Sequence, residues 1–154
     1  MFEETKAVLF DLDGTIYYGS KIIDGANEAI DHCRDCGKRV FFLTNNSTKT
    51  RRQIFDKLQG MGISCNYEEV ITSGYVSALH VLQNGIKNLY VCGTDNLRLE
   101  LEDFGIKPVS EDEAENLLIG YDPDFDYVKC TIAVRVAKKA KRLIACNKER
   151  VFQG

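Results

Sequence analysis

Residues 7–15 read Ala-Val-Leu-Phe-Asp-Leu-Asp-Gly-Thr, and this stretch decides the fold. Its first four residues are apolar without alternation, a pattern typical of a strand buried on both faces of a helix-covered parallel sheet. Asp11 and Asp13 follow at the carboxyl end of that strand. Residues i and i+2 of an extended backbone point to the same side, so both carboxylates are expected to face one crevice. Ligands of open α/β sheets bind just outside the carboxyl ends of strands.

The alternative interpretation of the same stretch is a polar turn between a strand and a loop, because Asp and Gly are ordinary turn residues. We favour a functional site, because both acids come directly after a buried strand and are followed by Gly14 and Thr15.

Beyond this stretch the chain continues to alternate strands and helices. Strands are predicted at 38–43, 70–72, 88–92, 116–120 and 143–146, and helices at 25–36, 50–61, 74–83, 94–105 and 127–139. Gly37 and Gly62 end the first two helices, and Ser73 is expected to cap the third. Such a series predicts an α/β fold with a doubly wound parallel sheet. Thr44 then lies at the same sheet edge as Asp11 and Asp13.

Composition excludes several classes of protein. The chain has 154 residues, 44% hydrophobic and 28% charged, which corresponds to one ordinary domain or to a small domain plus part of another. A net charge of −3 argues against a general nucleic-acid binder. We see no signal peptide and no apolar segment of membrane-spanning length. Six scattered cysteines suggest reduced thiols and a cytoplasmic location.

One Cys-x-x-Cys pair, Cys33 and Cys36, falls near the end of a predicted helix. Redox pairs of this kind usually open a helix, where the dipole lowers the thiol pKa, and a zinc site would need a second pair. We therefore interpret both cysteines as incidental helix residues. His32 and His80 have no nearby ligand partners in the sequence, and we interpret them as structural.

The residues at the sheet edge predict phosphoryl transfer. A carboxylate there can act as a nucleophile, and a second one can protonate the leaving group and later deprotonate water. Attack of an anion on a phosphate needs a cation, so Mg²⁺ is expected on the oxygens of Asp11 and Asp13. Thr44 and Asn45 can hold the phosphate oxygens. No phosphate-binding loop of the Walker type is present, which argues against a nucleotide kinase.

Two motifs carry a resemblance to a known family. Residues 11–19, Asp-Leu-Asp-Gly-Thr-Ile-Tyr-Tyr-Gly, resemble motif I of the haloacid dehalogenase superfamily, and residues 42–48 resemble motif II of its subfamily IIA. That subfamily includes NagD and the 4-nitrophenylphosphatase-like enzymes. Residues 71–74 and 91–94 are also similar to it.

The resemblance implies a fold and a function. It implies a doubly wound core with an α/β cap inserted after motif II. Asp11 would be the nucleophile and a Mg²⁺ ligand, and Asp13 the general acid and base with its carbonyl on the metal. Thr44, helped by Asn45, would bind the transferring phosphate. The implied activity is that of a phosphatase acting on small phosphorylated metabolites, with no nucleic-acid or membrane partner.

The chain also departs from the family pattern. The lysine of motif III and the acidic pair of motif IV, which lie beyond the cap, are not reached by residue 154. We therefore expect the N-terminal half of a core at residues 1–83, most of a cap at 84–154, and weak or incomplete activity. Uncovered strand edges would favour self-association. The alternative function is that of a non-catalytic relative or interaction module.

Overall fold

The computed structural model describes residues 3–148, which form two compact units. The first unit comprises Met1–Thr44 and Arg51–Ile71, and the second comprises Asn45–Thr50 and Thr72–Gly154. The chain therefore crosses from one unit to the other between residues 44 and 45, 50 and 51, and 71 and 72. Both units combine helices with parallel strands, which confirms the predicted α/β class.

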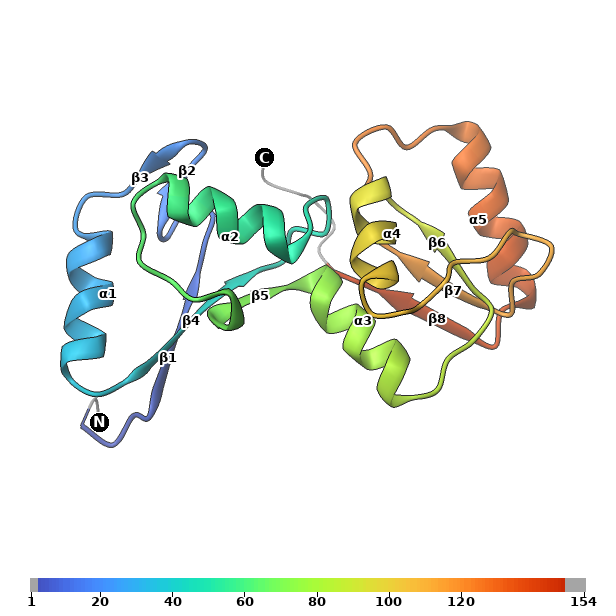
Figure 1. Cartoon of the computed structure of the whole chain (residues 1–154). Coiled ribbons are helices and arrows are strands. Elements are labelled where there is room, and N and C mark those ends of the chain that lie inside the picture. Colours follow the sequence, from blue (N-terminus) through green and yellow to red (C-terminus); the bar gives the residue numbers. More distant parts are fainter. Residues whose placement is uncertain (1–2, 149–154) are drawn as a thin grey trace. The chain divides into compact units, whose positions relative to one another are not determined.

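The first unit is built on a three-stranded sheet (Figure 1). Its elements are β1 (Ala7–Asp11), β2 (Tyr17–Tyr18), β3 (Lys21–Ile22), α1 (Ala26–Asp35), β4 (Arg39–Thr44), α2 (Arg51–Gly60), the 3₁₀ helix η1 (Tyr67–Glu69) and β5 (Val70–Thr72). The strand order is β1-β4-β5, and β1 runs parallel to β4 with Asp11 opposite Leu43. A short antiparallel hairpin of β2 and β3, which the sequence analysis did not predict, follows the loop after β1.

Both long helices of this unit pack on the same core. Ile30 of α1 and Leu58 of α2 lie in one buried cluster with Val40 and Phe42 of β4. Side chains alternate between the faces of a strand, so these helices cover only one face of the sheet. Leu9 on β1 has the opposite parity and is 57% exposed. The prediction that the first strand is buried on both faces was therefore wrong for Leu9.

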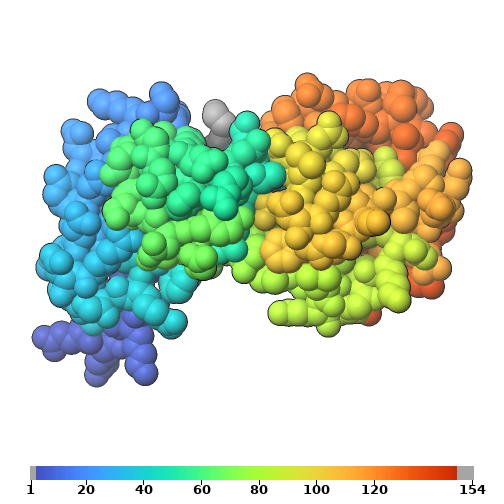
Figure 2. Space-filling model, viewed as in Figure 1, coloured from blue at the N-terminus to red at the C-terminus, as the bar shows by residue number. Residues whose placement is uncertain are grey.

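The second unit contains a separate parallel sheet with the order β6-β7-β8. Its elements are α3 (Ser73–Gln83), β6 (Leu89–Cys92), α4 (Asp95–Glu102), β7 (Asn116–Ile119), α5 (Tyr127–Lys139) and β8 (Arg142–Ala145). Helices α3 and α4 share a core with Val91 and Leu118, whereas α5 shares another with Cys92 and Leu117. The helices therefore cover both faces of this sheet. Figure 2 shows the side chains of α3 and α4 covering one of them.

Helix α3 begins one residue earlier than predicted. The hydroxyl of Thr72, not that of Ser73, caps it by accepting a hydrogen bond from the Tyr75 N–H at 3.0 Å. Ser73 is already helical, and its hydroxyl donates to the carbonyl oxygen of Asn45. Contacts group α3 with the second unit. The expected boundary between residues 83 and 84 stays a prediction.

Among the described residues, no helix has the length and apolar character needed to cross a bilayer. The six cysteines are all unpaired thiols. Cys33 is buried in the core of the first unit and Cys36 is exposed, so the Cys-x-x-Cys pair is not a disulfide.

Candidate active site

The carboxyl end of β1 leads into a tightly closed loop. The carbonyl oxygen of Leu12 accepts hydrogen bonds from the backbone N–H groups of Thr15, Ile16 and Tyr17 at 3.2, 2.9 and 3.2 Å. The Gly14 N–H donates to the Tyr17 carbonyl at 2.8 Å. Gly14 has a φ of +83°, a conformation that other residues rarely adopt, which explains the glycine in this turn. The backbone that carries the two acids is thus held by four hydrogen bonds within the loop.

Asp11 and Asp13 are both exposed at this strand end, and both act on the same buried phenol. Tyr17, in the same loop, is only 1% exposed. Burial raises the pKa of Tyr17 far above its ordinary value, and the negative charges of Asp13 and Asp11 raise it further. The sequence analysis missed Tyr17, although it stands in the quoted motif.

Thr44 lies at the end of the neighbouring strand, as predicted. Because Asp11 is opposite Leu43 in the parallel register, Thr44 is one residue beyond that level. Its side chain is 6% exposed. The first unit therefore brings Asp11, Asp13 and Thr44 to one edge of its sheet.

Asn45 follows Thr44 directly but belongs to the second unit. The carbonyl oxygen of Asn45 accepts a hydrogen bond from the Ser73 hydroxyl at 2.9 Å. Ser47 and Thr48 also form hydrogen bonds within the second unit. The Ser47 hydroxyl accepts a hydrogen bond from the Tyr121 N–H at 2.9 Å, and the Asn96 side-chain amide donates one to the Thr48 carbonyl at 2.8 Å. The structure thus groups Thr44 and Asn45 with different units.

Comparison with known proteins identifies the family. Residues 8–107 match the family model of haloacid dehalogenase-like hydrolases. The chain belongs to this family. It is 34% identical over 154 residues to an acid sugar phosphatase of Staphylococcus haemolyticus, an alignment that covers 96% of this chain and 59% of that relative.

Solved structures support membership of subfamily IIA of the haloacid dehalogenase-like hydrolases. A 4-nitrophenylphosphatase from Thermotoga maritima superposes with a TM-score of 0.89 at 27% identity, over 96% of this chain and 57% of that one. A solved structure described as a nagD protein superposes with a TM-score of 0.89 at 27% identity, over 97% of this chain and 59% of that one. The resemblance to subfamily IIA is confirmed, and the chain spans about three fifths of the length of these relatives.

The donor atoms near β1 suit the divalent cation expected in this family. Mg²⁺ prefers carboxylate, carbonyl and water oxygens, and proteins commonly bind it through one or two carboxylates plus water and substrate phosphate. Asp11 and Asp13 supply two exposed carboxylates. Within residues 3–148, no group of three or more His, Cys, Asp or Glu side chains could hold a metal ion. Asp11 and Asp13 are therefore a pair of carboxylates that could contribute to binding a divalent cation, short of a complete protein ligand set.

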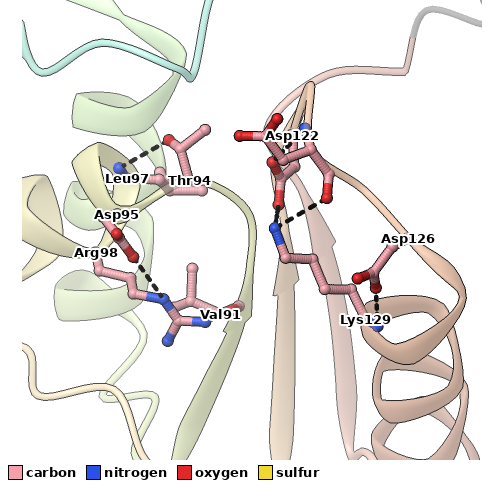
Figure 3. Close-up of polar contacts among 9 residues, drawn as sticks. Val91, Thr94, Asp95, Leu97, Arg98, Asp122, Asp126 and Lys129 are labelled. Carbon is pink, nitrogen blue, oxygen red and sulfur yellow. Dashed lines mark hydrogen bonds and ion pairs between the residues drawn. The ribbon is translucent and has the colours of Figure 1, made fainter.

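A second polar cluster lies at the carboxyl ends of β6 and β7 (Figure 3). The side chain of Asp122 is 3% exposed, and its carboxylate accepts a hydrogen bond from the Lys129 ammonium group at 2.8 Å. That hydrogen bond lowers the pKa of Asp122 and raises the pKa of Lys129, so both groups stay charged. On the β6 side of this cluster, the Arg98 guanidinium donates a hydrogen bond to the Val91 carbonyl oxygen. Asp122, Lys129 and Arg98 are thus bound within their own strand–helix connections, which indicates a structural role for these three residues.

Proposed function

We propose that this chain carries the nucleophile and the general acid of a Mg²⁺-dependent phosphatase acting on small phosphorylated metabolites. The observation that carries this proposal is the convergence of Asp11, Asp13 and Thr44 at one sheet edge in a chain that belongs to the haloacid dehalogenase-like hydrolases. The phosphatase names of the relatives support the same reaction class.

The reaction follows from the roles of the two acids. A carboxylate oxygen of Asp11 attacks phosphorus, so that an O–P bond to Asp11 forms while the bond to the leaving oxygen breaks. Asp13 donates its proton to that leaving oxygen. As a carboxylate, Asp13 then takes a proton from the water that attacks the aspartyl-phosphate, which releases inorganic phosphate and regenerates Asp11.

Thr44 and Asn45 are proposed to hold the phosphate oxygens during this exchange. A hydroxyl and an amide N–H can both donate to those oxygens. Mg²⁺, held by the Asp11 carboxylate and the Asp13 carbonyl, would offset the repulsion between the anionic nucleophile and the phosphate.

The test is hydrolysis of 4-nitrophenyl phosphate by this chain, with Mg²⁺ and with a chelator. Asp11→Asn should abolish metal-dependent turnover, because an amide does not form the aspartyl-phosphate. The matched control is Asp35→Asn, the same substitution at an exposed position on α1. Turnover retained by Asp11→Asn would refute the assignment of the nucleophile.

A second function, that of a non-catalytic interaction module, is favoured by the exposed Leu9 on β1. Leu9 lies on β1, an edge strand of the described sheet, and an exposed edge strand can pair with another chain. Folded protein that binds no Mg²⁺ and shows no turnover would support this function over the first.

A further inference from the structure

The hydroxyl of Ser73 does not cap the helix that this residue begins. Thr72 is the N-cap of α3, and its side chain accepts a hydrogen bond from the Tyr75 N–H at 3.0 Å. The hydroxyl of Ser73 donates instead to the carbonyl oxygen of Asn45, 28 residues earlier in the chain, at 2.9 Å. Alanine has a higher helix propensity than serine, so the helix alone does not require a hydroxyl at this position. The contact with Asn45 therefore accounts for the serine.

This hydrogen bond lies where two neighbouring strands end. β4 and β5 are adjacent in the sheet, and their last residues are Thr44 and Thr72. Asn45 and Ser73 are the residues that follow, so the bond between them joins the two chain segments just outside the sheet. Ligands of open α/β sheets bind outside the carboxyl ends of strands. The Ser73 hydroxyl thus acts on the backbone at the edge that carries Thr44 and Asp11.

A fixed carbonyl oxygen fixes the peptide group to which it belongs. The peptide bond between Asn45 and Asn46 is planar and trans, so its N–H points away from its C=O. The bond from Ser73 therefore also sets the direction of the Asn46 N–H. The peptide group before Asn45 begins at Thr44, the last residue of β4. Because the peptide groups on both sides of it are placed, Asn45 has one backbone conformation, and its Cα–Cβ bond has one direction.

The residues that follow Asn45 are held by separate contacts. The side-chain oxygen of Asn46 accepts hydrogen bonds from the N–H and the hydroxyl of Thr48 at 2.8 and 2.7 Å. The Thr48 carbonyl in turn accepts a hydrogen bond from the Asn96 amide. These bonds restrain the loop from Asn46 onward, so loss of the Ser73 hydroxyl releases chiefly the peptide group after Asn45.

We propose that Ser73 is a positioning residue of the phosphate site, whose hydroxyl holds the Asn45 carbonyl so that the amide donors after Thr44 face the phosphate oxygens. This inference rests on the proposed role of Thr44 and Asn45 in binding the phosphate. Donors that are already oriented stabilise an anion without having to be reoriented when it binds. Without the hydroxyl the peptide group can rotate, and part of the binding free energy is then lost in ordering it.

A purely structural role would have a different consequence. If the hydroxyl only stabilised the fold, Ser73→Ala would lower Tm and leave the affinity of the folded protein for phosphate unchanged. A positioning role predicts the reverse, because Thr72 still caps α3 in this variant. Thr72→Ala, which removes the cap, provides the reference for a structural loss in Tm.

The experiment measures the Kd of inorganic phosphate by isothermal titration calorimetry on the full chain in the presence of Mg²⁺. Ser73→Ala should raise Kd about threefold to tenfold, the range expected for one hydrogen bond, and Ser73→Thr, which keeps the hydroxyl, should restore it. The matched control is Ser110→Ala, which removes a hydroxyl that donates to Glu113 at 2.9 Å elsewhere in the second unit. An unchanged Kd in Ser73→Ala, or no recovery in Ser73→Thr, would overturn the proposal.

A second measurement is independent of phosphate. NMR relaxation of the Asn46 backbone amide reports the order of the peptide group that Ser73 holds. We expect a lower order parameter in Ser73→Ala than in the wild type and in Ser110→Ala, and equal values would overturn the positioning role. A wild type that binds no phosphate would refute the proposed function and, with it, the phosphate role of Ser73.

Discussion

Replacing Gly120 with alanine gives the sharpest test of the packing in the second unit. A methyl group at this position would lie 2.5 Å from Cδ2 of Leu97 and 3.0 Å from the hydroxyl oxygen of Ser47. Favourable carbon contacts begin near 3.5 Å, so at least one group must move. Leu97 is 1% exposed and belongs to the core between α4 and the sheet, which leaves it little room.

The expected cost follows from these distances. Overfilling a well-packed core costs about 1–3 kcal/mol. Ser47 cannot give way freely either, because its hydroxyl accepts the Tyr121 N–H. We expect Gly120→Ala to lower the free energy of unfolding by about 1–3 kcal/mol and Tm by about 2–4 °C per kcal/mol.

Urea unfolding followed by circular dichroism provides the assay. The control is Gly60→Ala at the end of α2, where an added methyl has no neighbour within 4 Å and helix propensity predicts a gain of up to about 1 kcal/mol. In a Leu97→Val background, which lacks the δ carbons, the cost of Gly120→Ala should shrink. A cost that is absent, or that stays the same in that background, would refute the steric reasoning.

Three further outcomes are expected. The ion pair with Lys129 lowers the pKa of Asp122, so this ion pair stabilises the fold fully above the ordinary carboxyl pKa and is lost as the pH falls through the lowered pKa of Asp122. The urea midpoints of the wild type and of Asp122→Asn should therefore converge in acid. A difference between the two midpoints that stays constant with pH would contradict this. Leu58→Ala, at a fully buried position of α2, should cost about 2–5 kcal/mol in the same unfolding assay, whereas a loss below 1 kcal/mol would argue against the core assignment. The exposed Leu9 on β1 predicts self-association, so sedimentation velocity should show oligomers that Leu9→Lys reduces; a monomeric wild type would count against it.

Most of the regular structure was predictable from the sequence. Strands with unbroken apolar runs, such as residues 117–119 of β7, and helices with clear end signals, such as the one stopped before Gly37, were confirmed within one or two residues. Gly37 has a φ of +69°, which is the left-handed conformation expected after a helix. These features depend on local pattern, which a sequence displays directly.

Features that depend on packing were not predictable in the same way. The apolar run of β1 does not reveal that Leu9 lies on the uncovered face, because both neighbouring helices pack on the other side. The hairpin of β2 and β3 has two residues in each strand, too few to produce a pattern of alternation. Tyr17 looks like any aromatic residue of the motif until the fold buries its ring close to the charges of Asp13 and Asp11.

The three crossings of the chain between the two units limit how they can be separated. A single protease cut or a single truncation does not yield both units intact, because Asn45–Thr50 interrupts the first unit while it binds the second. Expressing residues 72–148 alone would leave the Tyr121 N–H without the Ser47 hydroxyl and the Asn96 amide without the Thr48 carbonyl. Dissection of this protein therefore requires a circularly permuted or two-fragment design in which residues 45–50 accompany the second unit.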